Sequence, residues 1–270
     1  MNIVFAGNYK VFKGMLLGAL SIIKHYKDKV HFYILTMDLQ EVDSDYITVS
    51  EENIKLLESV VKEVNNDSRV TKIDVTSLYV KTLLESPNSK TRYTAYTLLR
   101  LLLDKIPRIP NKVLYLDTDV LAFNNISELY NIDISNYELA GVKDRYGRFF
   151  MGPCYLNAGV LLFNMKKIKE TGLFKKCRDY LNKKKVFLSD QTAINKYVKQ
   201  KKILKRRFNE QKKVKKDTVV RHFSMQFRLF PKFHFVNIKP WHKQRLHNEY
   251  KCHHFDDILE KYETITKEQL

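Results

Sequence analysis

Two periods of hydrophobic positions alternate in the first third of the chain. Residues 2–6, 30–36 and 69–75 are short runs of strand length, rich in β-branched and aromatic side chains. Between them, residues 12–23 and 51–64 carry apolar side chains three or four positions apart, the spacing of one helical face. Strands that alternate with helices in this order predict an α/β fold with a mostly parallel central sheet flanked by helices.

The same two patterns continue along the rest of the chain. Helices are predicted over residues 94–104, 165–182, 189–200 and 256–265. Further strands are predicted over residues 112–116, 138–142, 156–163 and 218–223. Because no internal repeat and no linker-like run interrupts them, we predict one domain, residues 1–240. A basic and aromatic C-terminal extension with a terminal helix, residues 241–270, follows it.

Two carboxylates come directly after the predicted strand 112–116. Asp117 and Asp119 are one residue apart, so on an extended chain both side chains project to the same side. A buried, unpaired carboxylate pair is unstable, and its hard oxygens suit a divalent ion such as Mg²⁺ or Mn²⁺ that can hold a diphosphate. A bare D-x-D can also be a strand end that faces water. The apolar run before the pair favours the metal site.

More polar residues occupy strand ends and helix starts. Asp144 follows the strand 138–142, Asn157 lies near the start of the next strand, and Asp190-Gln191 lie where a helix begins. Taken singly, each is most often a cap or turn residue. Ligands of parallel sheets bind beyond the carboxyl ends of the strands, so together with the Asp pair these residues predict a polar pocket.

Charge is distributed unevenly along the chain. The net charge is +18, yet residues 1–159 hold 19 basic and 19 acidic residues, so the whole excess lies in residues 160–270. Such a half could bind nucleic acid, an anionic membrane or a polyanionic acceptor, or be a solvated surface, and charge alone does not decide. Because the aromatic residues lack the pattern of nucleic-acid-binding domains, we expect no specific nucleic acid. We predict peripheral contact with an anionic membrane.

Cysteine content and hydropathy predict a cytoplasmic protein. Three cysteines without C-x-x-C spacing indicate reduced thiols and neither a disulfide framework nor a zinc site. Met1 leads straight into a strand without a signal sequence, and the apolar stretches are too short to span a bilayer. The expected location is the cytoplasm, with peripheral contact at the inner membrane surface.

Seven segments, in the family's order, resemble the retaining glycosyltransferases of family 8, which include bacterial lipopolysaccharide galactosyltransferases and glycogenin. The matching segments are residues 3–6, Arg100, residues 112–120, Asp144, residues 157–162, residues 190–191 and residues 239–241. The most specific are the D-x-D strand and Asn157-Ala158-Gly159-Val160. The resemblance implies a GT-A type Rossmann-like fold, a catalytic domain over residues 1–240, a UDP-sugar donor and Mn²⁺, with Mg²⁺ as the second choice of metal.

The resemblance also implies roles for the matching residues. Asp117 and Asp119 would bind the metal, Thr118 between them would contact the donor nucleotide, and Lys239 would neutralise the diphosphate. Asp190 and Gln191 are the candidate catalytic residues. The other implied donor contacts are Ala6 and Asn8 at the uridine, the arginine Arg100, and Asp144, Asn157, Ala158, Asp190 and Gln191 at the sugar.

Two positions depart from the family pattern. Asn8 stands where the family commonly has Asp; its amide still accepts a hydrogen bond from the uracil N–H, so we expect a weaker or altered base contact. The family's metal-binding histidine ends a short strand a few residues before Lys-Pro-Trp. His222 has the strand context but lies seventeen residues before Lys239, whereas His234 has nearly the right spacing but lies in an aromatic run. We choose His222 and interpret residues 224–236 as an inserted loop.

The resemblance implies a retaining hexosyltransferase that moves glucose or galactose from a UDP-sugar to a glycan, glycolipid or glycoprotein acceptor, in cell-surface polysaccharide biosynthesis. Retention needs either two displacements, with Asp190 as nucleophile, or front-face attack assisted by the leaving phosphate, which we favour. A nucleotidyltransferase usually has a Gly-rich phosphate-binding loop near the N-terminus. Residues 7–10 do not form such a loop, which argues against this class of enzyme. The basic half is also compatible with a nucleic-acid- or membrane-binding protein, or with a non-catalytic homologue. The intact Asp pair and the intact Asp190-Gln191 argue against a non-catalytic homologue.

Overall fold

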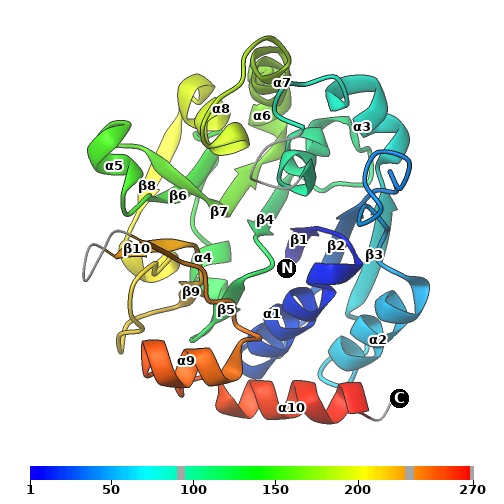
Figure 1. Ribbon diagram of the computed structural model, residues 1–270, viewed down its shortest axis with the longest axis vertical. Helices are drawn as coiled ribbons and strands as arrows, with labels where there is room; N and C mark the ends of the chain where they lie inside the picture. Colours follow the sequence, from blue (N-terminus) through cyan, green and yellow to red (C-terminus); the bar gives the residue numbers. More distant parts are fainter. Residues whose placement is uncertain (90–94, 229–233, 268–270) are drawn as a thin grey trace.

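A seven-stranded sheet runs through the protein, with strand order β3-β2-β1-β4-β7-β6-β8 and helices on both faces (Figure 1). This computed structural model describes residues 1–89, 95–228 and 234–267. The strands of the sheet are β1 (Asn2–Ala6), β2 (His31–Thr36), β3 (Arg69–Asp74), β4 (Lys112–Leu116), β6 (Leu139–Lys143), β7 (Leu156–Asn164) and β8 (Lys201–Leu204). Within this seven-stranded sheet all strand pairs except those of β7 are parallel, so the predicted α/β fold with a mostly parallel sheet is confirmed.

β7 breaks the parallel pattern, which the hydrophobic pattern did not predict. It pairs antiparallel with both β4 and β6. The connection between β6 and β7 contains only the one-turn helix α5 (Gly147–Phe150), which is too short to carry the chain back across the sheet. As a result Leu116 at the end of β4 pairs with Val160, and the start of β7 lies beside the Asp pair.

Apolar side chains fill both faces of the sheet. Along β1, Ile3 and Phe5 belong to one core and Val4 and Ala6 to the other, as the two-residue period of a strand requires. Helices on the first face are α1 (Phe12–His25), α2 (Glu51–Lys62) and α10 (Asp256–Lys267). Helices on the second face are α3 (Thr76–Leu83), the 3₁₀ helix η2 (Ala95–Lys105), α6 (Met165–Thr171), α7 (Leu173–Lys183) and α8 (Ser189–Tyr197).

Smaller elements complete the side of the molecule beside β4. Two antiparallel pairs are formed by β5 (Val120–Ala122) with β9 (Val220–His222) and by β10 (Gln226–Arg228) with β11 (His234–Val236). The remaining helices are α4 (Ser127–Tyr130), α9 (Lys243–Tyr250) and the short 3₁₀ turns η1 (Tyr9–Val11) and η3 (Arg206–Phe208). Among the described helices, none has the length and apolar character needed to cross a membrane.

Several predicted boundaries were wrong. Residues 165–182 form two helices, because Gly172 adopts a left-handed φ of 66° between α6 and α7. The helix predicted over residues 189–200 stops at Tyr197, and β8 then pairs with β6 despite its lysines. The polar helix α9 was not predicted either.

Two predicted segments overlap residues that the structure does not describe. The described part of residues 224–236 contains β10 and β11, so this segment is more than a loop, and residues 229–233 lie outside the described chain. Thr94, the predicted start of a helix, also lies outside it, and the described part of that helix is η2.

Gly14 lets α1 pack directly against the backbone between Asp117 and Asp119. A Cβ atom at residue 14 would lie 2.1 Å from the Thr118 carbonyl oxygen and 2.6 Å from the Trp241 ring. We therefore expect Gly14→Ala to lower the free energy of unfolding by about 1–3 kcal/mol, because overpacking outweighs the gain in helix propensity. Urea unfolding followed by circular dichroism measures this loss.

Gly18→Ala in the same helix is the matched control. The nearest atom to its added Cβ would be in the Phe5 side chain, 3.1 Å away, so we expect a smaller loss than at Gly14. Equal stability of Gly14→Ala and wild type would contradict the close packing of α1 against the Thr118 backbone.

Candidate active site

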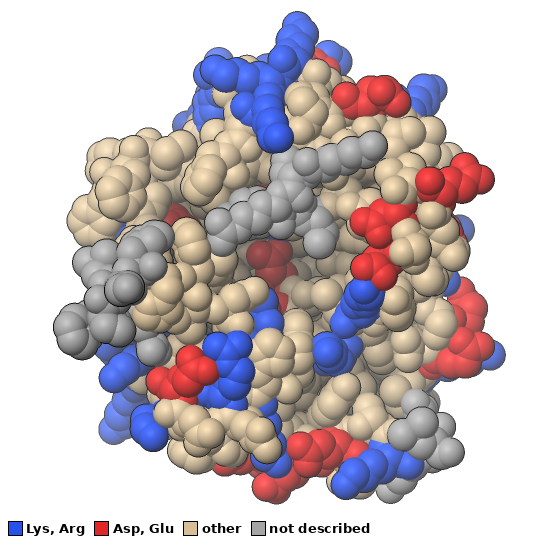
Figure 2. Space-filling view, viewed as in Figure 1, with Lys and Arg blue, Asp and Glu red and all other residues tan. Residues whose placement is uncertain are grey.

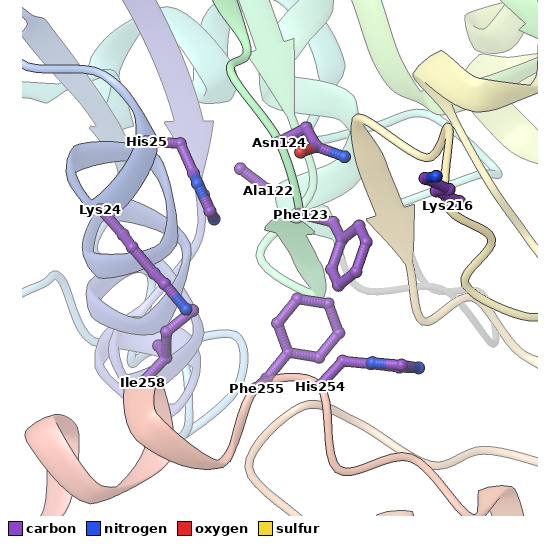
Figure 3. Close-up of a pocket in the computed structure, with 9 residues that line it drawn as sticks. All are labelled: Lys24, His25, Ala122, Phe123, Asn124, Lys216, His254, Phe255 and Ile258. Atoms are coloured by element: carbon purple, nitrogen blue, oxygen red, sulfur yellow. The ribbon is translucent and has the colours of Figure 1, made fainter.

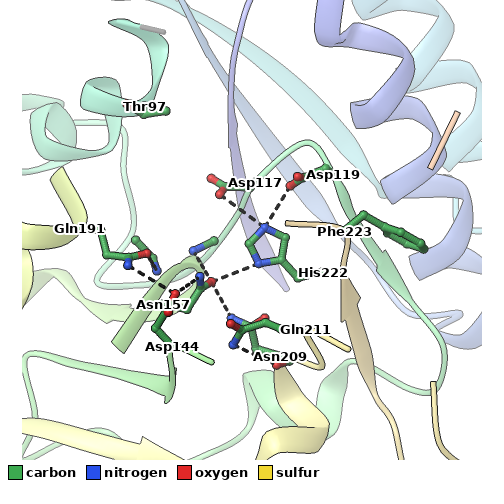
Figure 4. A network of polar contacts seen from close by, with 12 residues as sticks. Thr97, Asp117, Asp119, Asp144, Asn157, Gln191, Asn209, Gln211, His222 and Phe223 are labelled. Carbon is green, nitrogen blue, oxygen red and sulfur yellow. Dashed lines mark hydrogen bonds and ion pairs between the residues drawn. The ribbon is translucent and has the colours of Figure 1, made fainter. Parts of the chain in front are cut away.

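Asp117, Asp119 and His222 meet at the carboxyl end of β4 (Figure 4). β5 begins directly after the Asp pair, and its first residue, Val120, pairs with His222 of β9. This strand pairing places the His222 imidazole beside the carboxylates. His222 Nε2 lies 3.1 Å from Asp119 Oδ1 and 3.8 Å from Asp117 Oδ2. In Figure 2 the molecule is hollowed near the centre of the face shown, and acidic side chains lie at the bottom of the hollow.

Two cations from distant parts of the chain compensate the carboxylates. Arg100 of η2, only 2% exposed, places its Nη2 2.8 Å from Asp117 Oδ1 and its Nε 3.1 Å from Asp190 Oδ2. Lys239, which precedes α9, places its Nζ 2.5 Å from Asp119 Oδ2. Each carboxylate of the pair therefore has its own cation.

This arrangement keeps Asp119 ionised. Burial alone would raise the pKa of its carboxyl, but Lys239 and His222 outweigh burial and hold the pKa below its ordinary value. Burial likewise acts to lower the pKa of Arg100, and Asp117 and Asp190 outweigh it and raise the pKa. The centre is therefore a set of fixed charges, in which the anions and cations stabilise one another.

Asn157 connects the histidine to the rest of the pocket (Figure 4). Its Oδ1 lies 3.1 Å from His222 Nδ1 and accepts hydrogen bonds of 3.0 Å from Gly159 N and from Asn209 Nδ2. Its Nδ2 donates to Asp144 Oδ2 over 2.9 Å. The amide thus fixes the imidazole so that Nε2 faces the carboxylates, an orientation that suits a metal ligand.

The predicted donor-sugar residues gather next to this amide. Gln191 accepts a 2.9 Å hydrogen bond from Ala158 N and donates to Asp144 over 3.4 Å, while the Ala158 carbonyl accepts a hydrogen bond from Arg100. Asp144 also accepts hydrogen bonds from Tyr146 N and Gly147 N, so it is a turn residue as well. The structure brings Asp144, Asn157, Ala158, Asp190 and Gln191 into one polar network.

The predicted uridine residues lie at the same edge of the sheet. β1 runs parallel beside β4, so Ala6 at its end and Asn8 beyond it flank the Asp pair. Both residues are buried, and the Asn8 side chain donates a 2.8 Å hydrogen bond to the Asp45 carbonyl. That bond engages one side of the amide and orients it within the loop.

The two candidate histidines lie in different surroundings. His222 is 4% exposed and contacts both carboxylates, whereas His234 lies exposed in β11 and is not part of this cluster. Strand pairing between β5 and β9 decides this placement, because it is independent of the number of residues inserted before Lys239.

Sequence reasoning missed two amides of the site. Asn209 is fully buried and donates to Asn157, and Gln211 accepts a 2.9 Å hydrogen bond from Arg145 N and donates to the Lys143 carbonyl. Both lie in the lysine-rich run 199–216, where charge dominated the interpretation. Their spacing of two would place them on one side of an extended segment. Their hydrogen bonds, however, go to partners more than fifty residues away, which the local sequence does not report.

The donor set fits a divalent cation. Asp117, Asp119 and His222 each offer one ligand atom, and these atoms lie within 4.8 Å of one another. Two carboxylate oxygens and one imidazole nitrogen match the ligands of Mn²⁺, Mg²⁺ and related ions. The site is therefore chemically able to hold a metal.

Two proteins named as glycosyltransferases are similar in sequence to most of this chain. A putative glycosyltransferase of Haemophilus influenzae is 30% identical over 224 residues, which are 77% of this chain and 63% of that protein. Glycosyltransferase GlyA of Streptococcus pneumoniae is 30% identical over 195 residues, 72% of this chain and 25% of that protein. The chain thus spans less than two thirds of the length of these two relatives.

A solved structure with the same fold and a match to a family model point to the same kind of protein. A structure of the galactosyltransferase LgtC in complex with donor and acceptor sugar analogs has the same fold, with a TM-score of 0.70 at 21% identity over 97% of this chain and 96% of that one. The family model for glycosyl transferase family 8 matches residues 2–245. The chain belongs to glycosyl transferase family 8.

Proposed function

We propose that this chain is a metal-dependent, retaining hexosyltransferase that moves glucose or galactose from a UDP-sugar to a glycan, glycolipid or glycoprotein acceptor. The observation that carries the proposal is the convergence of Asp117, Asp119 and His222, with Lys239 at 2.5 Å from Asp119, in a chain of this family. The likeness to LgtC, solved with donor and acceptor sugar analogs, supports a nucleotide-sugar donor and a carbohydrate acceptor. Residues 1–240 would be the catalytic domain and residues 241–270 its extension.

Charge compensation is the chemical task of this site. A divalent cation, Mn²⁺ in first place and Mg²⁺ in second, held by the two carboxylates and His222, would stabilise the negative charge of the departing UDP. Lys239 would neutralise the diphosphate from the side of Asp119. Arg100 holds Asp117 and Asp190 in place, and its own charge is fixed by them.

The remaining pocket residues would bind and orient the donor. Asp144, Asn157 and Gln191 offer carboxylate and amide groups to sugar hydroxyls, and the Ala158 backbone lies between them. Ala6, Asn8 and Thr118 would contact the nucleotide. The proposed biological role of this reaction is cell-surface polysaccharide biosynthesis.

We favour front-face attack over two displacements. A double displacement needs a free carboxylate at the anomeric carbon, and Asp190 is 5% exposed with Oδ2 3.1 Å from Arg100 Nε. In front-face attack the bond from the anomeric carbon to UDP breaks and the bond to the acceptor oxygen forms on the same side. The leaving phosphate accepts the proton of the acceptor hydroxyl. Asp190 and Gln191 then act by orienting the sugar and Arg100.

The membrane and cytoplasmic assignments stay predictions. They rest on charge distribution, cysteine content and hydropathy, and the site geometry supplies no argument for either. The transferase proposal stands without them.

Release of UDP tests the proposal directly. Wild type is incubated with UDP-glucose, UDP-galactose or a GDP-sugar, in the presence of Mn²⁺, Mg²⁺ or EDTA. We expect a UDP-hexose to be hydrolysed with Mn²⁺ and to survive in EDTA. Asp119→Ala should retain less than about a tenth of the turnover, because loss of a metal ligand costs more than about 1.4 kcal/mol of transition-state stabilisation.

Asp179→Ala is the control, because this exposed α7 carboxylate pairs only with the surface residue Lys175 among its described ion pairs. It should keep wild-type turnover. Turnover above a tenth in Asp119→Ala, or hydrolysis that is unaffected by EDTA, would refute a metal-dependent site at the Asp pair.

The buried Asp190 predicts a pH dependence of stability. Burial raises its pKa to about 6, against the opposing effect of Arg100, whereas an unfolded Asp has a pKa near 3.8. Between these values the unfolded chain releases the proton and the folded chain keeps it, so stability falls as pH rises. The loss is on the order of 3 kcal/mol and is complete above about pH 6.

Asp190→Asn lacks this ionisation and serves as the reference. Urea unfolding of both proteins in EDTA, from pH 4 to pH 7, isolates the contribution as the difference between them. We expect wild type to lose stability relative to Asp190→Asn across this interval. A constant difference from pH 4 to pH 7 would mean that Asp190 titrates normally.

A further inference from the structure

A second cluster of metal-ligating side chains lies at the joint between α9 and α10. His247 Nε2 lies 2.6 Å from Asp256 Oδ1, and His253 Nδ1 lies 3.2 Å from Asp256 Oδ2. The two imidazole rings lie against each other, with centroids 4.1 Å apart. Within the described residues, this is one of two groups of three such side chains whose ligand atoms all lie within 4.8 Å, the other being the active-site triad.

The local backbone holds the three side chains together. α9 ends at Tyr250, and its C-cap residue Lys251 has a left-handed φ of 49° that turns the chain. Cys252 N then donates a hydrogen bond back to the Leu246 carbonyl. Phe255, 2% exposed, packs its ring against Phe123 and Phe223 and anchors the joint in the core. The cluster is therefore built on a fixed turn between two helices.

We propose that His247, His253 and Asp256 form a Zn²⁺ site distinct from the active site. Two imidazole nitrogens and one carboxylate oxygen are a typical three-ligand set for zinc, with water as the fourth ligand. The side chains are 25%, 61% and 31% exposed, so solvent has access to that fourth position. The active-site triad has two carboxylates and one imidazole, a harder set that suits Mn²⁺ or Mg²⁺ better.

The distances require only small adjustments. Ligand atoms of a tetrahedral zinc site with bonds of about 2.0–2.1 Å lie roughly 3.3 Å apart. His253 Nδ1 is 3.2 Å from Asp256 Oδ2, and His247 Nε2 is 2.6 Å from the other oxygen, Oδ1, so the carboxylate would turn to present one oxygen to the metal and the His247 contact would lengthen. Side-chain rotation at the joint supplies this without a change in the helices.

Zinc at this joint would tie the C-terminal helices to each other and to the catalytic body. α9 and α10 lie side by side at one end of the molecule (Figure 1). α10 contacts α1 through the pair Lys24–Asp257 at 2.6 Å and the C-cap of α2 through the pair Lys261–Glu63 at 3.3 Å. α9 follows the segment that carries Lys239. The site would therefore stabilise the part of the chain that delivers this lysine.

His254 provides a matched control, because it faces elsewhere. It lines a separate pocket of about 300 Å³ between α1, β5 and α10, and its ring meets Phe123 edge-on with centroids 5.3 Å apart (Figure 3). Although it is adjacent to His253 in the sequence, it is not part of the metal-ligating cluster.

Zinc binding to the full chain tests the site. Asp117→Asn/Asp119→Asn removes the active-site carboxylates, and Zn²⁺ is titrated into this background by calorimetry, with Co²⁺ absorption as a spectroscopic report of tetrahedral geometry. We expect one Zn²⁺ per chain and a rise in Tm. Adding His247→Ala or His253→Ala should weaken binding by about tenfold or more, and adding His254→Ala should leave it unchanged.

Two results would overturn the proposal. One is zinc affinity weaker than about 0.1 mM in the background protein, which would leave a hydrogen-bonded His-Asp-His triad only. The other is equal affinity with and without His253. Because the His253 side chain is largely exposed, His253→Ala folds even if His247→Ala does not, and its titration decides the question.

Discussion

The repulsion between Asp117 and Asp119 is the constraint on which the rest of the site depends. The two carboxylates follow one strand and face the same side, and Asp119 is 8% exposed. Leaving such charges unpaired would cost several kcal/mol, so cations must reach them. Arg100 arrives from η2 and Lys239 from the segment before α9, which are far apart in sequence. The charges of this centre are therefore balanced before any ligand binds.

Close backbone packing makes this centre possible. A Cβ at Gly159 would lie 2.2 Å from the His222 ring and 2.8 Å from Asp117 Oδ2, so only glycine leaves room for the imidazole beside the carboxylate. Gly14 serves the same purpose on the α1 side. Asn157 then couples the imidazole to Asp144. One amide thus joins the cluster of Asp117, Asp119 and His222 to Asp144.

Hydrophobic patterns within short segments predicted the strands and helices that such segments determine by themselves. β1, β2 and their partner helices follow from hydrophobic period, and the D-x-D strand from its apolar run. The reversal of β7, the lysine-bearing β8 and the buried Asn209 depend on pairing partners far away in sequence, which no local period reports. His222 was chosen over His234 on strand context, and the pairing of β5 with β9 places it beside the Asp pair. The catalytic roles of these residues stay predictions.

Mn²⁺ affinity in two histidine variants tests the central claim, that strand pairing makes His222 the third member of the metal centre. Mn²⁺ is titrated into His222→Ala and His234→Ala in the presence of UDP, and bound metal is followed by electron paramagnetic resonance. We predict at least about tenfold weaker binding in His222→Ala and wild-type binding in His234→Ala. Weaker binding in His234→Ala alone would contradict the account.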